Sequence, residues 1–188
     1  MSDTSNLMAG KRGLIMGVAN KRSIAWGIAT ACRNAGAELA LTYQGEALKK
    51  RVEPLAEELD AFVAGDCDVT DEASIDAVFE TLEKKWGKLD FLVHAIAFSD
   101  KDELTGRYVD TTADNFRKTM DISVYSFTSV AQRAEKLMSD GGSMVTLTYY
   151  GAEKVNGGAR RGSRGQQILE SRFTNNYSLL AIPAHCRS

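Results

Sequence analysis

Short apolar runs alternate regularly with longer segments of helical period along this chain, and this alternation limits the folds that it can adopt. Runs rich in Val, Ile and Leu occupy residues 13–18, 37–44, 61–69, 89–98 and 142–150, and helical spacing of apolar residues occupies 23–36, 45–59, 73–87 and 115–138. Continuous apolar strands joined by helices are typical of a parallel sheet buried on both faces. The alternation therefore predicts an α/β fold with a doubly wound, Rossmann-like parallel sheet and right-handed crossovers.

Local signals within the helical segments predict where they begin or bend. In the first segment Ile24, Ile28 and Cys32 recur at intervals of four. Pro54 lies inside the second segment and predicts a kink or a break, because proline removes a helical hydrogen bond. Thr70 and Asp71 are the candidate N-caps for the third segment.

The character of the chain changes after Val155. Residues 156–188 contain five arginines and one glutamate, together with glycine, serine and asparagine and little apolar period. We therefore expect a dinucleotide-binding domain over residues 1–155 and an irregular basic tail over 156–188, either disordered or foreign to the domain. Within that tail, only residues 177–182 have the composition of a short buried segment.

Charge and cysteine content exclude several classes of function. The formal net charge is -2 and the pI is near 5.8, so no overall basic field favours nucleic acid or an anionic membrane. Cys32, Cys67 and Cys186 form no CxxC and no metal-binding spacing, which predicts neither disulfides nor a metal site and suits a reducing compartment. No segment reads as a signal peptide or as a bilayer-spanning run, so we expect a cytoplasmic protein.

In a doubly wound sheet, ligands bind beyond the carboxyl ends of the strands, so the residues there are the candidate site. Gly17 ends the first strand, and Ser23 and Ile24 open a helix whose N-terminal amides favour a phosphate. The spacing is not GxGxxG, and an ordinary strand-to-helix turn is the alternative. Gln44, after the second strand, can hydrogen-bond adenosine but decides little between NAD and NADP.

The third and fourth strands add further candidates. Asp68 can accept a hydrogen bond from an adenine amino group and Val69 can cover the ring, although Asp68 is equally a candidate helix cap. Small and apolar residues around Ile96 would let a ribose and a nicotinamide approach the backbone. His94 lies inside an apolar strand, and we interpret it as a core residue with satisfied ring nitrogens and no catalytic role.

Six stretches of the chain together resemble one enzyme family. They are "GVANKRSIAWGIA", "GAELALTYQGEALKKRV", "CDVTDEASIDAVF", "FLVHAIAF", "DISVYSF" and "LTYYGAEK", in unbroken order from about Lys11 to Lys154. The chain thereby resembles the bacterial enoyl-acyl-carrier-protein reductases, a divergent branch of the short-chain dehydrogenase/reductase superfamily. The resemblance implies an oxidoreductase of fatty acid biosynthesis that transfers hydride from NADH to a trans-2-enoyl thioester on acyl carrier protein.

The same resemblance implies roles for particular residues. It assigns NADH contacts to Gly17, Ser23, Ile24, Gln44, Asp68, Val69 and Ile96. It places Ser99 at the substrate entrance and makes Tyr149 the first active-site tyrosine. Tyr150 and Lys154 have the Tyr-x-x-x-Lys spacing of ordinary superfamily members, but Tyr150 is still at the strand end, so we interpret the pair as coincidence.

Other features of the family are missing from this sequence. The family has a second tyrosine about ten residues after the first and a lysine seven residues further, where this chain has Ala159 and Gln166. Its later strands, substrate-covering helices and tetramer-forming helices have no counterpart either, so the homotetramer of the family is not expected here. Three hypotheses follow: an NADH-dependent reductase, a catalytically inactive truncated dinucleotide-binding module, or an interaction protein that uses the arginine-rich tail.

Overall fold

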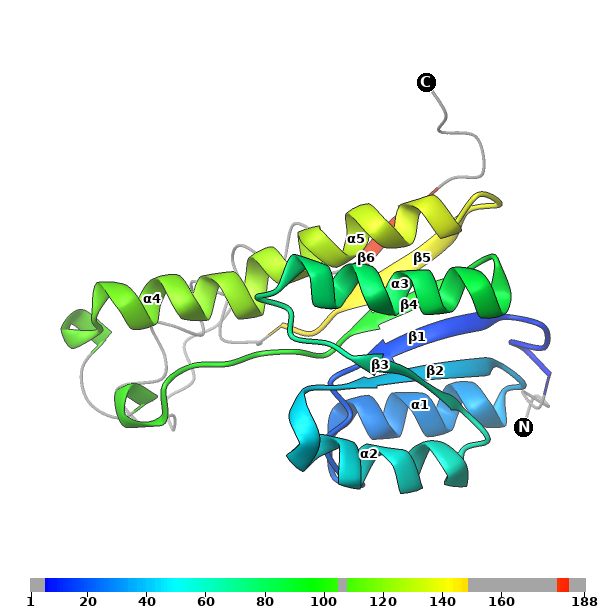
Figure 1. Ribbon diagram of the computed structural model, residues 1–188, viewed down its shortest axis with the longest axis horizontal. Helices are drawn as coiled ribbons and strands as arrows, with labels where there is room; N and C mark the ends of the chain where they lie inside the picture. Colours follow the sequence, from blue (N-terminus) through cyan, green and yellow to red (C-terminus); the bar gives the residue numbers. More distant parts are fainter. Residues whose placement is uncertain (1–5, 105–107, 149–178, 183–188) are drawn as a thin grey trace.

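The fold is an α/β sheet with helices on both faces, seen in a computed structural model that describes residues 6–104, 108–148 and 179–182 (Figure 1). The described strands form one sheet in the order β3-β2-β1-β4-β5-β6. The parallel strands are β1 (Arg12–Met16), β2 (Glu38–Tyr43), β3 (Phe62–Asp66), β4 (Phe91–His94) and β5 (Gly142–Thr146). The strand order reverses between β1 and β4, which confirms the predicted doubly wound parallel sheet.

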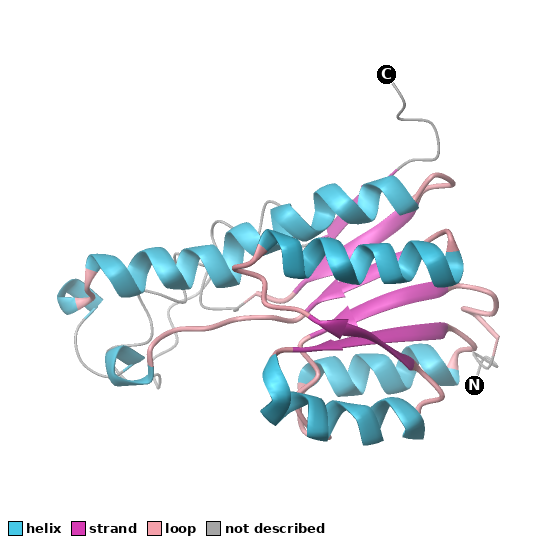
Figure 2. Ribbon diagram, viewed as in Figure 1, coloured by secondary structure: helices cyan, strands magenta, loops and turns pink. Residues whose placement is uncertain are grey.

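Two layers of helix cover the sheet (Figure 2). The helices are α1 (Ile24–Asn34), α2 (Gly45–Glu58), α3 (Glu72–Trp86), α4 (Ala113–Met120) and α5 (Ser126–Leu137). In Figure 1, α1 and α2 lie below the sheet, and α3 and α5 lie above it. The side chains of β1 show why: Leu14 and Met16 pack with α3 and α5, whereas Ile15 packs with α1 and α2, as the two-residue period of a strand requires.

The last described strand lies in the segment that we expected to be an irregular tail. Strand β6 (Leu179–Ile182) pairs antiparallel with β5, from Gly142 opposite Ile182 to Val145 opposite Leu179. These residues belong to the one stretch of the tail, 177–182, whose composition suits burial. Apart from β6, the residues from 149 to the end of the sequence lie outside the described part of the chain. The domain boundary at residue 155 therefore stays a prediction.

The helices differ from expectation in two places. Helix α2 runs unbroken through Pro54, so the predicted break was wrong. Val52, Leu55 and Ala56 are buried against the sheet, and this packing holds the helix together despite the missing backbone donor. In α1 the four-residue spacing of Ile24, Ile28 and Cys32 did not mark the buried residues, which are Ala25 and Ala29. Their small side chains allow α1 to approach the sheet closely.

The long helix expected over 115–138 is interrupted by a π-helical turn. Helix α4 leads into a π turn, Asp121–Tyr125, which continues directly into α5. Helix α4 and the short 3-10 turns η1 (Lys101–Leu104) and η2 (Tyr108–Asp110) extend beyond the carboxyl ends of the strands (Figure 1). We call residues 95–104 and 108–125 the arm. π turns are frequently found at functional sites, so the arm is a candidate for one side of a functional site.

Candidate functional site

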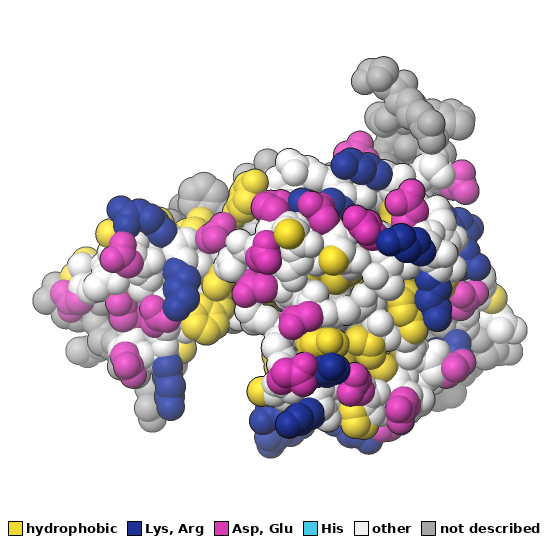
Figure 3. Space-filling view, in the orientation of Figure 1, with side chains coloured by type: hydrophobic (Ala, Val, Ile, Leu, Met, Phe, Trp, Pro, Cys, Tyr) yellow, Lys and Arg dark blue, Asp and Glu magenta, His cyan; other side chains and the backbone are white. Residues whose placement is uncertain are grey.

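A cleft of about 580 Å³ lies between the carboxyl ends of the strands and the arm. Figure 3 shows the molecule hollowed there, with hydrophobic side chains along the arm. One side, which we call the strand wall, consists of residues 17–19, 42–44, 48 and 67–70; the other, the arm wall, consists of residues 95–98, 118 and 122. The cleft therefore lies where ligands bind in doubly wound sheets.

Gly17 fixes the contact between the first strand and the arm wall. Its φ angle of 93° lies in the left-handed region, which favours glycine. A Cβ atom at this position would lie 2.0 Å from the backbone oxygen of Ala95. Only glycine fits this close backbone approach.

Asp68, Gln44 and Val69 come together on the strand wall, as the sequence predicted. The Asp68 carboxylate accepts hydrogen bonds from the backbone N–H and the hydroxyl of Thr70, at 2.9 and 2.7 Å. These bonds, with a smaller contribution from the Gln44 side chain, hold the pKa of the Asp68 carboxyl below its usual value. Asp68 is therefore an ionised acceptor at the cleft, suited to an amino or hydroxyl donor. The N-cap of α3 is Asp71 and not Asp68.

Cys67 lines the cleft without being a reactive thiol. Its backbone N–H donates to the Tyr43 carbonyl at 2.7 Å, which ties the end of β3 to the end of β2. Burial, with added repulsion from Asp66 and Asp68, raises the pKa of the thiol to about 12. The protonated thiol is a small apolar surface and not a nucleophile.

Ser23 and Ile24 lie at the start of α1 and outside the cleft-lining residues. Ser23 is the N-cap, and its hydroxyl accepts from the Trp26 N–H at 3.3 Å. The first turn of α1 has no acidic residue, so the positive field of its N-terminus is not offset there, which suits a phosphate. The Ile24 side chain is 68% exposed.

The arm wall is positioned by a reciprocal pair of hydrogen bonds from the π turn. The Phe98 N–H donates to the Ser123 hydroxyl at 3.1 Å, and that hydroxyl donates to the Phe98 carbonyl at 3.2 Å. Lys118 places its ammonium 4.7 Å from the centroid of the Phe98 ring and 2.8 Å from an Asp100 carboxylate oxygen. Ile96, which was predicted as a cofactor contact, lies on the same wall.

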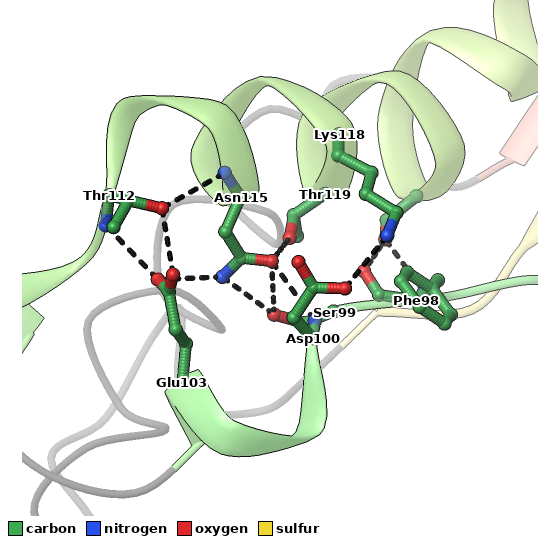
Figure 4. A network of polar contacts seen from close by, with 9 residues as sticks. Phe98, Ser99, Asp100, Glu103, Thr112, Asn115, Lys118 and Thr119 are labelled. Atoms are coloured by element: carbon green, nitrogen blue, oxygen red, sulfur yellow. Dashed lines mark hydrogen bonds and ion pairs between the residues drawn. The ribbon is translucent and has the colours of Figure 1, made fainter.

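Within the arm, a network centred on Asn115 joins residues 99–103 to α4 (Figure 4). The Asn115 side-chain oxygen accepts from the Asp100 N–H at 3.0 Å, and its amide nitrogen donates to Glu103 at 3.1 Å and to Ser99 at 3.3 Å. Asn115 is 2% exposed, so these bonds satisfy a buried amide. The structure thus places Ser99, the predicted entrance residue, beside Asn115 and next to the arm wall; its contact with substrate stays a prediction.

His94 is a core residue, as predicted. Its Nδ1 lies 3.1 Å from the Thr146 hydroxyl, and its Nε2 lies 2.8 Å from the Ser126 hydroxyl. The Ser126 hydroxyl also donates to the Ile122 carbonyl at 2.6 Å, an arrangement that leaves Nε2 as a donor to Ser126 and Nδ1 as an acceptor from Thr146. Burial lowers the pKa of His94 to about 4, so the imidazole is neutral at physiological pH.

Some predictions cannot be placed in the structure. Tyr149 and the coincidental pair Tyr150 and Lys154 lie outside the described residues. Within the described part, no group of three or more His, Cys, Asp or Glu side chains could hold a metal ion. None of the described helices is long and apolar enough to cross a membrane.

Apart from Ile96, the sequence did not single out the arm residues that shape the cleft. Lys118 and Ile122 are four residues apart, a spacing that places them on one helix face, and this was the available signal. Nothing local marks Ser123 or Asn115 as partners of residues 98–103, because those hydrogen bonds connect separate segments of the chain.

The fold and this cleft define a class: doubly wound, Rossmann-like α/β proteins with a ligand cleft at the strand ends. A family model described as "Enoyl-(Acyl carrier protein) reductase" matches residues 17–161. The chain belongs to this enoyl-(acyl carrier protein) reductase family.

Relatives and solved structures agree with that assignment. The chain is 76% identical over 155 residues to "Enoyl-[acyl-carrier-protein] reductase [NADH] 1" of Rhizobium meliloti, covering 82% of this chain and 57% of that protein. It matches an enoyl-acyl-carrier-protein reductase of Anaplasma phagocytophilum, solved with NAD, with TM-score 0.85 and 51% identity over 92% of this chain and 64% of that one. A Bacillus cereus reductase solved with NADP+ and an indole naphthyridinone matches with TM-score 0.84 and 40% identity over 91% and 65%. The chain thus spans less than two thirds of the length of each.

Proposed function

We propose that this chain binds NADH in the cleft between the strand wall and the arm wall. We further propose that it is an NADH-dependent enoyl-acyl-carrier-protein reductase of fatty acid biosynthesis. The observation that carries the proposal is the grouping of Gly17, Gln44, Asp68, Val69 and Ile96 around one cleft at the strand ends of a chain that belongs to this family. These are five of the seven residues to which the family resemblance assigns cofactor contacts; the other two, Ser23 and Ile24, lie at the start of α1.

Each wall suits a different part of a dinucleotide. On the strand wall, the ionised Asp68 and Gln44 would hold the adenosine, and Val69 would cover the adenine ring. The N-terminus of α1, with Ser23 as its cap and no acid in its first turn, would face the pyrophosphate. Ile96 and Phe98 on the arm wall would cover the nicotinamide end and exclude water from it.

The proposed substrate is a trans-2-enoyl thioester carried on acyl carrier protein, with Ser99 at its entrance and the cytoplasm as the compartment. Bound NADH would supply the hydride, and Tyr149 is the side chain that we propose to meet the thioester. Negative charge develops on the thioester oxygen during such a reduction, and one preorganised donor to an oxyanion is typically worth about 3 kcal/mol. The scattered cysteines, which form no CxxC, suit a reducing compartment.

Calorimetric titration of the purified chain with NADH tests the binding site. We expect a saturable site that Asp68→Asn weakens about tenfold, because a charge-assisted hydrogen bond is lost. Asp114→Asn is the matched control, since Asp114 is an exposed carboxylate on α4 that pairs only locally with Arg117. Equal NADH affinity in the Asp68 variant and the control would refute the assignment of Asp68.

A second candidate function is NADH binding without turnover. It is favoured by Ala159 and Gln166, which occupy the positions where the family has its second tyrosine and its lysine. Loss of NADH absorbance with a crotonyl thioester separates the two candidates. A reductase consumes NADH at a rate that Tyr149→Phe lowers roughly tenfold or more. A binding module leaves the absorbance unchanged with either residue at position 149.

A further inference from the structure

The structure brings an acidic side chain to the end of β2, where the sequence has none. Solved relatives include complexes with NAD and with NADP+, so membership of the family does not by itself decide which dinucleotide binds. In doubly wound sheets that decision falls to the group at the end of the second strand, beside the adenosine ribose. Here the local sequence is Thr42, Tyr43 and Gln44, which carries no charge.

Asp66 of the neighbouring strand β3 brings a carboxyl group to the end of β2. The pairing of β2 with β3 shifts between Leu41 and Thr42: Leu41 lies opposite Val63, but Thr42 lies opposite Gly65. This bulge brings Asp66, and not Gly65, level with Tyr43. The carboxyl group of Asp66 therefore lies beside the end of β2.

The Asp66 carboxylate also accepts a hydrogen bond from the first backbone amide of α2. The Gly45 N–H donates to the Asp66 Oδ1 at 2.9 Å, and Gly45 is the first residue of that helix. The Gln44 side chain does not cap the helix, so Asp66 supplies the acceptor from another strand. Helix N-termini attract phosphates through these amides, and here a negative charge is already in place.

The other charged side chains near the start of α2 do not cancel the negative charge of Asp66. Glu46 adds a second negative charge in the first turn of α2, and the Lys49 ammonium lies 3.4 Å from its carboxylate. The strand wall has no basic side chain among the cleft-lining residues that the structure describes; the lysine of the cleft, Lys118, is on the arm wall and pairs with Asp100.

We propose that Asp66 selects NADH over NADPH, an inference that rests on the proposed function. Tyr43 and Gln44 line the cleft directly before Gly45, so a 2′-phosphate on the adenosine ribose would approach the start of α2. Asp66 already accepts the hydrogen bond of the Gly45 N–H, which the phosphate would otherwise use. The negative charge of Asp66 also repels the negative charge of the phosphate. A ribose with a free 2′-hydroxyl carries no charge for Asp66 to repel and does not need the Gly45 amide.

The test is calorimetric titration of the whole chain and of Asp66→Asn with NADH and NADPH. Asparagine keeps an oxygen acceptor for the Gly45 N–H and removes the negative charge, with an NH2 group in place of the second oxygen. We expect Asp66→Asn to tighten NADPH binding about tenfold and to change NADH binding less than about twofold, as the loss of one nearby repulsion predicts. Glu80→Gln, which removes one charge from an exposed pair on α3, is the control and should change neither affinity.

The outcomes separate this inference from the proposed function. An NADPH-to-NADH affinity ratio that is the same in wild type and Asp66→Asn would overturn the inference while leaving NADH binding intact. If wild type binds neither dinucleotide, the proposed function fails. Titration with 5′-AMP and 2′,5′-ADP then still tests Asp66, since the variant must favour 2′,5′-ADP. Failure to bind these fragments would overturn both. Asp66→Ser serves if the asparagine variant does not fold.

Discussion

The strand wall and the arm wall face the same cleft but are held in place by different interactions. The strand wall follows from the sheet: Cys67 donates to the Tyr43 carbonyl, and Gly17 lies against the Ala95 backbone. The arm wall depends on side chains: the Ser123 hydroxyl holds the Phe98 backbone, and Asn115 holds residues 99–103.

Because of this difference, the two walls should respond differently to substitution. The ladder of backbone hydrogen bonds ties the strand wall to the stability of the whole domain. The arm extends beyond the sheet and depends on a few buried polar groups, so a single substitution there should act locally. We therefore expect substitutions that disturb the backbone contacts of the strand wall, such as those at Gly17, to destabilise the domain, and substitutions in the arm to alter the cleft. Four predictions follow this division, from the largest effect to the smallest.

Gly17→Ala should have the largest effect, because Gly17 is where the two walls meet. The new Cβ would lie 2.0 Å from the Ala95 oxygen, and alanine is strained at a φ of 93°. We expect a loss of about 4 kcal/mol in the free energy of unfolding, measured by urea denaturation. Gly27→Ala is the control, since its Cβ would meet nothing within 4 Å. Equal stability of the two variants would show that the walls are not locked together at Gly17.

His94 should make the sheet between the walls sensitive to acid. Its pKa is lowered to about 4 in the folded protein and is near 6.5 in the unfolded chain. Between these values the unfolded state binds a proton that the native state excludes, so stability falls as pH falls from about 6.5 to 4. The loss approaches about 3 kcal/mol.

The measurement for His94 is the urea midpoint across this pH range, compared with His94→Gln. The variant removes the titrating group, so its slope between pH 6.5 and 4 should be shallower, whatever its absolute stability. Carboxylates such as Asp68, whose pKa is lowered, lose their contribution below this window and affect both proteins equally. Identical slopes would mean that His94 is protonated in the native state.

Asn115→Ala tests the arm wall alone. The substitution leaves the Asp100 N–H and the Glu103 carboxylate without their Asn115 partner, which should cost about 2 kcal/mol in unfolding free energy. If the arm acts locally, NADH binding weakens while 5′-AMP binding, on the strand wall, is unchanged. Arg117→Ala, on the exposed side of α4, is the control for helix content. Equal loss of affinity for both ligands would contradict the division into two walls.

Lys118→Met should have the smallest effect on stability. The Lys118 and Asp100 side chains are 49% and 43% exposed, and such surface pairs contribute about 0.5 kcal/mol or less. Methionine keeps the apolar contact with the Phe98 ring, so the arm wall should keep its shape. Thermal unfolding measures the change at low and at high salt. A large loss at low salt would show that electrostatics, and not Asn115 and Ser123, hold the arm.

The sequence predicted the strand wall better than the arm wall. Gly17, Gln44, Asp68 and Val69 are at or after strand ends, and strand ends follow from apolar runs that are local in the chain. Ser99 and Asn115 are sixteen residues apart, and Phe98 and Ser123 twenty-five, so no local pattern connects them. The break predicted at Pro54 is absent for a related reason, because packing of α2 against the sheet outweighed a local preference.

The doubly wound sheet, the strand-end residues and the family could be predicted from the amino-acid sequence, because each depends on the periodicity or order of neighbouring residues. The contacts between residues of different strands could not, because they depend on how distant segments pack. The bulge in β2–β3 pairing brings Asp66 to Gly45, and the π turn brings Ser123 to Phe98. Such contacts depend on register and on crossings between distant segments, and a change of one residue in register would move either side chain away from its partner.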